Sequence, residues 1–334
     1  MIQSQFLSNC TADAMRDAVA NLARGALVAF PTETVYGLGA DACNSAAVAR
    51  VYSVKGRPFD HPVIVHIASM DRMGDWAKDV PMFAIALARD FWPGPMTLVL
   101  KRSALAGDFI TGGQETVGLR VPDHVVALAL LEAFENIGGK GVAAPSANRF
   151  GHVSPTTAAA VSEEIGEYLD STDLIIDGGA CAVGVESTII DCTGDLPRIL
   201  RPGAITISMI EHSTGIAVAD NDVSRLLKDS QEILLTDIRV SGSLETHYAP
   251  KAVVVLDITP VAGQGFIALA DIETPAGVIR LAAPHTDNEF AQILYASLRQ
   301  ADADGLSEVV VMQPVGGGIA IAIRDRLRRA SNGR

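Results

Sequence analysis

The chain has 334 residues, of which 49% are hydrophobic and 19% are charged, and its net charge is −13. A length above 300 residues exceeds one typical core, so we expect two domains. The negative charge opposes long-range attraction to a phosphate backbone, and every apolar run is shorter than the roughly 18 residues that cross a bilayer. We therefore expect a soluble, cytoplasmic protein that holds any anionic ligand in a local positive pocket.

The first elements of the chain surround a polar stretch. Thr11 is a suitable N-cap for a helix to about Arg24, and the apolar residues 26–30 form a strand that Pro31 ends. A group of hydroxyls and one carboxylate follows, namely Thr32, Glu33, Thr34 and Tyr36. Gly37 and Gly39 then permit turns. Open α/β sheets bind ligands at the carboxyl ends of their strands, so this stretch is a candidate site, with an ordinary polar loop as the alternative.

The next elements bring basic residues to strand ends. Asn44 is a suitable cap for a helix over 46–54, which leads to Lys55, Gly56 and Arg57 and then to the strand 63–65 with His66 at its end. Further helices are predicted over 81–91, 124–134 and 154–169, and further strands over 96–100, 117–121, 141–144, 174–176, 186–192 and 198–200. This order predicts an α/β fold with a mixed, twisted, open sheet and covering helices.

The remaining chain predicts a second, smaller domain. Strands are expected over 252–256, 266–270, 277–281 and 309–312, and helices over 289–301 and 319–329. Their alternation is typical of a small Rossmann-like α/β domain. We place the first domain at 8–208, a linker at 209–250 and the second domain at 251–334.

Five basic residues stand beside strand ends or turns, namely Lys55, Arg57, Arg120, Arg198 and Arg201. Guanidinium groups in such places bind phosphate or carboxylate in a forked geometry. Each residue alone is equally consistent with a structural ion pair. Convergence of all five on one cavity would indicate a polyanionic ligand.

The candidate polar residues look like binding groups. No G-x-S-x-G motif surrounds Ser146 or any other serine, which disfavours a serine nucleophile. His61, His66 and His247 are possible general bases, although structural roles are commoner for single histidines. The run Gly316–Gly318 precedes a predicted helix, but the complete phosphate-binding motifs are absent.

Metal and disulfide sites are not indicated. The cysteines Cys10, Cys43, Cys181 and Cys192 are scattered without a C-x-x-C motif, and no His, Asp and Glu cluster has the spacing of a metal cage. We expect reduced cysteines and no protein-bound structural metal. A divalent ion such as Mg²⁺ would arrive with the phosphates of a ligand.

A series of motifs carries a family resemblance. PTETVYGLG, KGRP, PGPMT, RVP, APSAN, ESTIID and RPG occur in this order, and THYAP follows. The set resembles the threonylcarbamoyl-AMP synthase family, whose catalytic part is a YrdC-like domain, and THYAP with a small α/β domain resembles its two-domain branch. The resemblance implies that L-threonine, bicarbonate and ATP give threonylcarbamoyl-AMP and pyrophosphate. A further enzyme system then transfers the threonylcarbamoyl group to an adenosine beside the tRNA anticodon.

The resemblance also implies roles for individual residues. The catalytic signature is Lys55, Arg57, Ser146 and Asn148. The ATP-binding positions are Arg57, His61, Thr116, Ser146, Ser154, Arg201 and Tyr248. The threonine-binding positions are Thr34, His66, Arg120, Ala144 and Ser187, with Arg120 as the partner of the threonine carboxylate. Tyr248 would fold back over the pocket with the linker. His61 departs from the family pattern, which commonly has Asn there.

Two other readings remain open from the sequence. One is an RNA-binding module of the same tRNA pathway, which the charge of −13 and the 5% of aromatic residues disfavour. The other is a carbamoyl-transfer domain of protein maturation, but the acylphosphatase and zinc-finger parts that accompany such domains are absent from this sequence.

Overall fold

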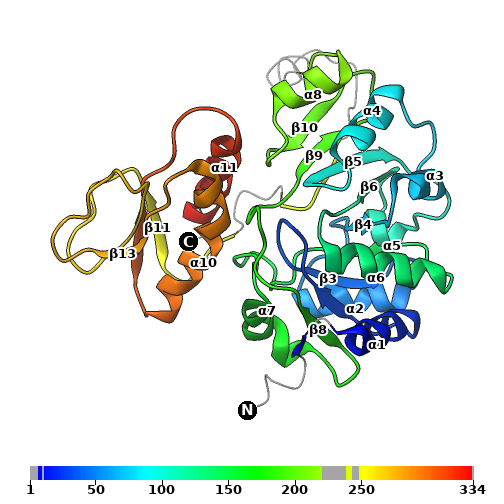
Figure 1. Ribbon diagram of the computed structural model, residues 1–334, viewed down its shortest axis with the longest axis horizontal. Helices are drawn as coiled ribbons and strands as arrows, with labels where there is room; N and C mark the ends of the chain where they lie inside the picture. Colours follow the sequence, from blue (N-terminus) through cyan, green and yellow to red (C-terminus); the bar gives the residue numbers. More distant parts are fainter. Residues whose placement is uncertain (1–6, 10, 220–237, 243–247, 333–334) are drawn as a thin grey trace.

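The computed structural model describes residues 7–9, 11–219, 238–242 and 248–332. It contains a larger and a smaller α/β unit, which lie side by side in Figure 1. Among the described residues, no helix combines the length and the apolarity that a membrane span requires.

The helices of the larger unit are α1 (Ala12–Ala23), α2 (Ser45–Lys55), α3 (Met73–Trp76), α4 (Met82–Phe91), α5 (Asp108–Thr111), α6 (Val125–Asn136), α7 (Ala158–Ile165) and α8 (Ile207–Thr214). Its strands are β1 (Leu7–Asn9), β2 (Val28–Phe30), β3 (Gly37–Asp41), β4 (Ile64–His66), β5 (Met96–Lys101), β6 (Thr116–Arg120), β7 (Val142–Ala143), β8 (Leu174–Asp177), β9 (Thr188–Asp191) and β10 (Arg198–Arg201). Short 3₁₀ turns cover Met70–Arg72 and Gly166–Tyr168.

Side-chain caps fix the helix starts that the sequence predicts. The hydroxyl of Thr11 accepts a hydrogen bond from the backbone N–H of Ala14, and the side chain of Asn44 accepts bonds from the first turn of α2. Helix α2 ends at Gly56, whose φ of 63° is left-handed. This ending places Lys55 on the last helical turn and Arg57 in the turn beyond it.

The larger sheet has ten strands in the order β1-β8-β2-β3-β7-β4-β6-β5-β9-β10. Strand pairs such as β4 with β6 and β5 with β9 are parallel, whereas β2 with β3 and β5 with β6 are antiparallel. The predicted mixed α/β sheet is therefore confirmed.

The stretch that contains Gly37 and Gly39 was predicted wrongly as turns. Gly37–Asp41 forms strand β3, antiparallel to β2, with Gly39 opposite Val28. A Cβ at Gly39 would lie 2.8 Å from Phe30 and 2.8 Å from Val142. The glycine therefore serves close packing between neighbouring strands and not a change of chain direction.

The sheet has two differently used faces. Successive side chains along a strand point to opposite faces of the sheet. In β5 and β6, Leu98 and Leu119 belong to the main core, whereas Thr97 and Arg120 point to the other face and lie near polar groups. The polar side chains His66 of β4, Thr97 of β5 and Arg120 of β6 thus lie on one face of the central strands.

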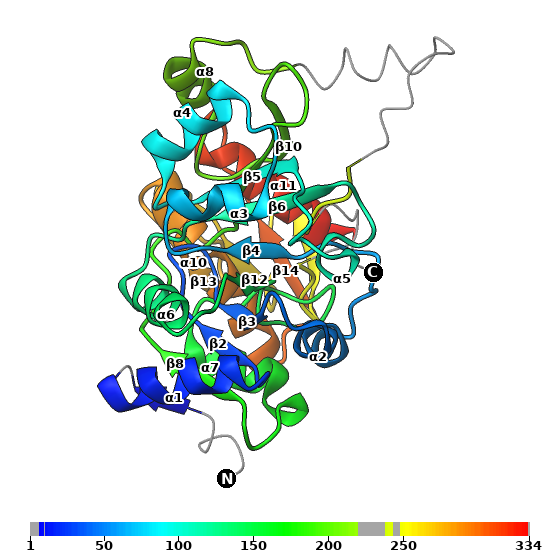
Figure 2. The ribbon, with the colours of Figure 1, turned by 90° about the vertical axis from the view of Figure 1, so that its right-hand side faces the viewer.

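The smaller unit has strands β11 (Val253–Leu256), β12 (Gly265–Ile267), β13 (Ile279–Ala282) and β14 (Glu308–Val311) and helices α10 (Asp287–Ala303) and α11 (Ile319–Ser331). Its strands pair in parallel in the order β11-β14-β12-β13, which confirms the predicted small α/β unit. Both helices lie between this sheet and the larger unit (Figure 1), and Figure 2 shows the larger unit from the front with the smaller one behind it.

Helix α8 was not predicted from the sequence. It crosses the boundary that we placed at residue 208, and its Ile210 is fully buried in the main core next to α4. The predicted linker therefore begins, in the described residues, with a packed helix. The boundaries of the domains stay a prediction.

Candidate active site

A small polar cavity of about 50 Å³ lies on the polar face of the central strands. Its wall includes nine of the residues that the sequence singles out, namely Thr34, Arg57, His66, Arg120, Ala144, Ser146, Ser187, Arg201 and Tyr248. They come from strands β4, β6 and β10, from the loops after α2, β2 and β7, and from the segments that precede β9 and β11. Segments that are more than 200 residues apart in sequence thus meet at one place.

Arg57 is buried at one side of this cavity. One of its terminal nitrogens donates to the carbonyl of Pro62 at 2.8 Å and to the hydroxyl of Ser241 at 3.1 Å. Its Nε has no hydrogen-bond partner among the described residues. Burial lowers the pKa of Arg57 to about 10, so the side chain stays charged at neutral pH. A buried guanidinium with an unused N–H is suited to an anionic ligand.

Arg120 stands at the end of β6 beside the end of β4. Its Nη2 donates to the hydroxyl of Thr34 at 2.8 Å and forms an ion pair with Glu33 at 2.7 Å. Glu33 also accepts a bond from the backbone of Asp123, which fixes the carboxylate. The ion pair therefore holds the guanidinium plane in one orientation at the cavity wall.

Arg201 is buried at the third side. Its Nε and Nη2 donate to the carbonyl of Ser187 at 3.2 and 2.9 Å, and Nη2 also donates to the Ser187 hydroxyl. Its Nη1 donates to the carbonyl of Ser241 at 2.9 Å. Ser241 thus accepts hydrogen bonds from both Arg57 and Arg201, although nothing in its sequence surroundings marked it as a site residue.

His66 ends β4 and lies next to Arg120 in the register of the sheet. Burial and the charge of Arg120 lower the pKa of His66 to about 3, so the ring is neutral at physiological pH. Its Nδ1 has no hydrogen-bond partner among the described residues. A neutral imidazole with this pKa is a binding group and a weak general base.

Lys55 and Asn148 stand behind the cavity wall. The Lys55 ammonium donates to the carbonyls of Ser146 at 2.6 Å and Asn148 at 2.5 Å. The amide of Asn148 donates in turn to the carbonyls of Arg149 and His152. Burial and the nearby Arg57 lower the pKa of Lys55 well below its ordinary value. Both residues therefore fix the loop that presents Ser146 to the cavity.

Ser154 is fully buried, and its hydroxyl donates to Glu186 at 2.6 Å. Glu186 itself lines the cavity. Since a serine hydroxyl has one hydrogen, this bond leaves its lone pairs as the groups for a ligand. Ser154 is thus prepared to accept a hydrogen bond and not to donate one to a phosphate oxygen.

Three further residues that the sequence singled out lie outside the cavity wall, as Lys55, Asn148 and Ser154 do. Thr116 lines a neighbouring hollow that shares Ile64 and Ser241 with the cavity. The ring of His61 packs edge-on against Phe150. Arg198 pairs with Asp191 at 2.9 Å across two strands, so this strand-end cation forms the structural ion pair that the sequence left open and does not join Arg57, Arg120 and Arg201 at the cavity.

Tyr248 closes the cavity from the linker side. It is almost fully buried, its φ is 65°, and its ring stacks on Tyr295 of α10 with centroids 5.7 Å apart. A Cβ at Gly242 would lie 2.2 Å from the Tyr248 hydroxyl, so only glycine permits this approach. His247 and Cys10 lie outside the described residues.

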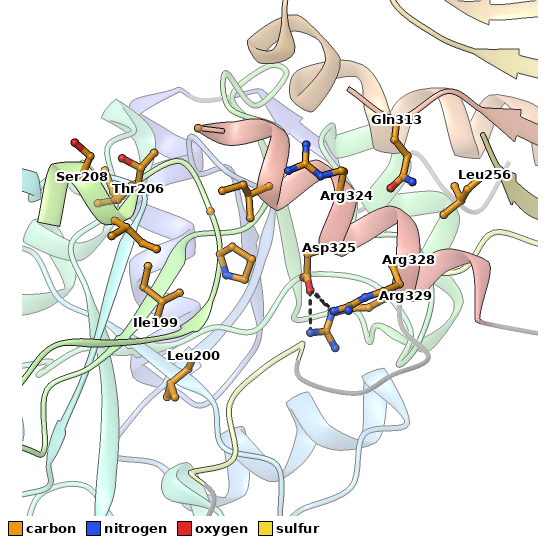
Figure 3. A pocket seen from close by; sticks show the side chains of 16 residues that line it. Ile199, Leu200, Thr206, Ser208, Leu256, Gln313, Arg324, Asp325, Arg328 and Arg329 are labelled. Atoms are coloured by element: carbon orange, nitrogen blue, oxygen red, sulfur yellow. Dashed lines mark hydrogen bonds and ion pairs between the residues drawn. The ribbon is translucent and has the colours of Figure 1, made fainter. Parts of the chain in front are cut away.

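A second cavity of about 880 Å³ lies between the two units (Figure 3). Its wall is mostly apolar on the side of the larger unit, with Ile199, Leu200 and Ile205. On the other side, Arg324 donates to the carbonyls of Pro314 and Gly316, while Arg328 and Arg329 contact Asp325. Gly318, from the glycine run Gly316–Gly318, lines this cavity and not the smaller one. No residue with a role implied by the family resemblance lines it.

Two of the important carboxylates had weak sequence signals. Glu33 lies in the PTETVYGLG motif and Glu186 begins the ESTIID motif, but the sequence assigned neither carboxylate a partner. A buried carboxylate beside several arginines is expected to neutralise one of them. That reasoning identifies Glu33 and Glu186 only once the contacts are known.

No group of three His, Cys, Asp or Glu side chains in the described part of the chain is arranged to hold a metal ion. The described cysteines Cys43, Cys181 and Cys192 have free thiols.

A mixed α/β unit with three buried arginines around one cavity has the equipment of an enzyme that handles anionic substrates. The family model described as telomere recombination, which covers the Sua5, YciO and YrdC proteins, matches residues 20–203. The model of the threonylcarbamoyl-AMP synthase C-terminal domain matches residues 205–332.

Individual relatives agree with these models. The threonylcarbamoyl-AMP synthase of Pyrococcus abyssi is 38% identical over 95% of this chain and 94% of its own length. That of Bacillus subtilis is 38% identical over 95% of this chain and 92% of its own. The crystal structure of P. abyssi Sua5 complexed with L-threonine superposes with a TM-score of 0.83 at 35% identity and covers 98% of both chains. This chain belongs to the threonylcarbamoyl-AMP synthase family and is an enzyme of the nucleotidyltransferase type.

Proposed function

We propose that the small cavity is where this chain carries out the reaction of its family. L-threonine and bicarbonate give N-carboxylated threonine, whose new carboxylate attacks the α-phosphate of ATP. Pyrophosphate leaves, and threonylcarbamoyl-AMP remains. The observation that carries this proposal is the convergence of the buried Arg57, Arg120 and Arg201 on one cavity.

The threonine part is assigned to the wall around Arg120. The guanidinium of Arg120 is oriented by Glu33 and would bind the threonine carboxylate. Thr34, His66 and Ser187 surround it, and the backbone of Ala144 completes the wall. The neutral ring of His66 can exchange a hydrogen bond with threonine without adding charge.

The nucleotide part is assigned to the wall around Arg57 and Arg201. Both arginines would bind phosphate oxygens, and Ser146 lies beside them. Lys55 and Asn148 support this role from behind by holding the Ser146 loop. Ser154 donates its hydroxyl hydrogen bond to Glu186, so it would accept a hydrogen bond from a hydroxyl or amine of the nucleotide. Thr116 and His61 would be reached only by the outer part of the nucleotide.

The chemical work is then positioning and charge neutralisation. ATP and the attacking carboxylate are both anions, and their Coulomb repulsion opposes contact. Three buried cations reduce this repulsion and stabilise the charge that develops on the α-phosphate. The site offers no activated nucleophile, so the transfer needs no covalent enzyme intermediate. We assign Mg²⁺ to the phosphates of ATP and not to the protein.

The size of the cavity indicates how the substrates get in. A volume of about 50 Å³ is far below the roughly 300 Å³ at which small-molecule sites begin. Ser241 accepts the hydrogen bonds of Arg57 and Arg201 that phosphate oxygens would accept. We therefore propose that ATP displaces Ser241, and that Tyr248 covers the bound intermediate. A covered site keeps a labile carbamate away from water.

The later steps of the pathway are proposed from the family. The product would pass to a separate enzyme system that modifies the adenosine beside the tRNA anticodon. Direct contact with tRNA is not required for the first reaction, and the cytoplasmic location stays a prediction from the sequence.

One experiment tests the site and the reaction together. We expect pyrophosphate release from ATP to require both L-threonine and bicarbonate, and to be abolished in Arg57→Ala with the fold retained. Pyrophosphate release that continues without threonine would contradict the reaction. Full activity in folded Arg57→Ala would contradict the site.

A further inference from the structure

The wall of the small cavity contains one carboxylate whose cationic partner comes from the other unit. Glu186 precedes β9 and is buried. A carboxylate there opposes the binding of ATP by Coulomb repulsion unless a cation compensates it. Burial alone would raise the pKa of Glu186, but Arg326 and Arg201 lower it to about 2, so the group is ionised at neutral pH.

Besides Arg201, the compensating groups of Glu186 lie on the two helices of the smaller unit. Nε of Arg326, on α11, donates to Glu186 Oε2 at 2.8 Å, and the hydroxyl of Tyr295, on α10, donates to the same oxygen at 2.9 Å. Arg326 is fully buried and also pairs with Asp325. The ion pair is therefore shielded from solvent and bridges the two units.

The same residues contact two groups of the proposed nucleotide site. The other oxygen of Glu186 accepts the hydrogen bond of Ser154. The guanidinium carbon of Arg326 lies 5.4 Å from the centroid of the Tyr248 ring. This ring stacks on Tyr295, and Tyr248 also lines the cavity. The smaller unit thus touches the site from behind, through Glu186 and Tyr248.

We infer that Arg326 is a positioning residue for the synthase reaction, which acts through Glu186 on Ser154 and through the ring contact on Tyr248. This inference rests on the proposed function of the small cavity. It gives the smaller unit a part in catalysis: its helix α11 neutralises a carboxylate of the nucleotide wall and fixes the residue that closes the site.

The test is a set of variants in the full chain, measured by steady-state pyrophosphate release and by thermal unfolding. Arg326→Met leaves Glu186 buried without its cation, and we expect kcat/KM for ATP to fall by roughly 100-fold. Glu186→Gln combined with Arg326→Met leaves no uncompensated charge, so at least tenfold of this loss should return. Arg326→Lys keeps the positive charge, so its kcat/KM for ATP should lie between those of Arg326→Met and the parent. The control Arg328→Met changes an exposed arginine on the same helix and should stay within twofold.

The kinetic constants separate positioning from a merely structural role. If Arg326 only held the units together, Arg326→Met would lower the unfolding midpoint, but the folded protein would keep the kcat and KM of the parent. The inference is overturned if folded Arg326→Met has a kcat/KM for ATP within twofold of the parent. It is also overturned if the double variant recovers none of the lost kcat/KM. Active Arg57→Ala would overturn the proposed site itself, whereas inactive Arg57→Ala beside fully active Arg326→Met overturns only the inference.

A second variant covers the case in which Arg326→Met does not fold. Tyr295→Phe removes only the hydroxyl that donates to Glu186 and keeps the stacked ring. We expect it to fold and to lose roughly tenfold in kcat/KM for ATP. Unchanged kinetics of Tyr295→Phe in that case would overturn the inference.

Discussion

The cavity between the units and the cavity on the sheet differ in size and in chemistry. Size favours the first as a binding site, whereas the chemistry of the wall favours the second. The cavity between the units measures about 880 Å³, against about 50 Å³ for the cavity on the sheet. Yet the arginines of the larger one are engaged by neighbouring carbonyls and by Asp325, whereas Arg57 keeps an unused N–H in the smaller one. The proposed active site is therefore identified by convergent buried charge and not by volume.

After Arg57→Ala, the largest loss of activity is expected from the substitution of Lys55, which lines neither cavity. Lys55→Ala removes the ammonium group that donates hydrogen bonds to the carbonyls of Ser146 and Asn148, and it thereby releases the loop of Ser146. Because a small misplacement of a reacting group is costly, we expect pyrophosphate release to fall by about 100-fold or more. Lys101→Ala, which changes an exposed lysine at the end of β5, is the matched control. Equal rates in the two variants would refute the supporting role.

Arg120 tests the threonine wall of the smaller cavity. Arg120→Met removes the proposed partner of the threonine carboxylate and leaves Glu33 without its cation. We expect KM for threonine to rise by about 30-fold, which steady-state kinetics at saturating ATP would measure. Arg198→Met changes a strand-end arginine that pairs outside the cavity, and its KM should not change. An equal effect in both would remove the distinction between them.

Tyr248 tests the closure of the smaller cavity. Tyr248→Ala removes the ring that stacks on Tyr295. We expect the fraction of threonylcarbamoyl-AMP that stays bound after one turnover to fall by about tenfold, since the cover also excludes water. Rapid filtration of a single-turnover mixture measures this fraction. A bound fraction equal to that of the parent would speak against the cover.

The interface between the two units should weaken in acid. Glu186 pairs with Arg326 of the smaller unit, whereas Glu164 is hydrogen-bonded to His152 of the larger unit and pairs with Arg299 of the smaller one. Burial opposes the ionisation of both carboxyls, but these partners lower the pKa of each from 4.5 to about 2. Their contribution to stability is present above pH 4.5 and is lost as the pH falls through 2. The free energy of unfolding, from urea titrations at pH 6, 4.5 and 3, should fall over this window. Glu164→Gln should make that fall smaller, and an unchanged slope would contradict the assignment.

The smallest effect is expected in the larger cavity. Arg328→Met removes an exposed arginine from its wall without touching the polar cavity. Pyrophosphate release should stay within twofold of the parent. A tenfold loss would reverse the ranking of the two cavities.

The sequence predicted much of the fold because local signals were strong. Thr11 and Asn44 mark helix starts through their capping side chains, and apolar runs with Pro and Gly breaks mark most strands. Strand β3 was missed because its glycines resemble turn residues, although Gly39 serves close packing against Phe30. Helix α8 was missed because it is short and its pattern is weak.

The site could be predicted from the sequence only in part, since its contacts are long-range. Motif resemblance named nine residues of the cavity wall. Arg198, which stands beside a strand end like the site arginines, pairs instead with Asp191. Ser241 and Arg326 carry no local pattern, and Glu186 lies in the ESTIID motif without a sign of its partner. Their roles depend on segments as much as 140 residues apart coming into hydrogen-bond contact, as Arg326 and Glu186 do.

The most direct test of the central claim is a crystal structure of the chain with L-threonine and a non-hydrolysable ATP analogue. We predict density for threonine beside Arg120 and for the phosphates between Arg57 and Arg201, with Ser241 displaced from both arginines. Density for the analogue in the cavity between the units, with the hydrogen bonds of Ser241 unchanged, would contradict the account.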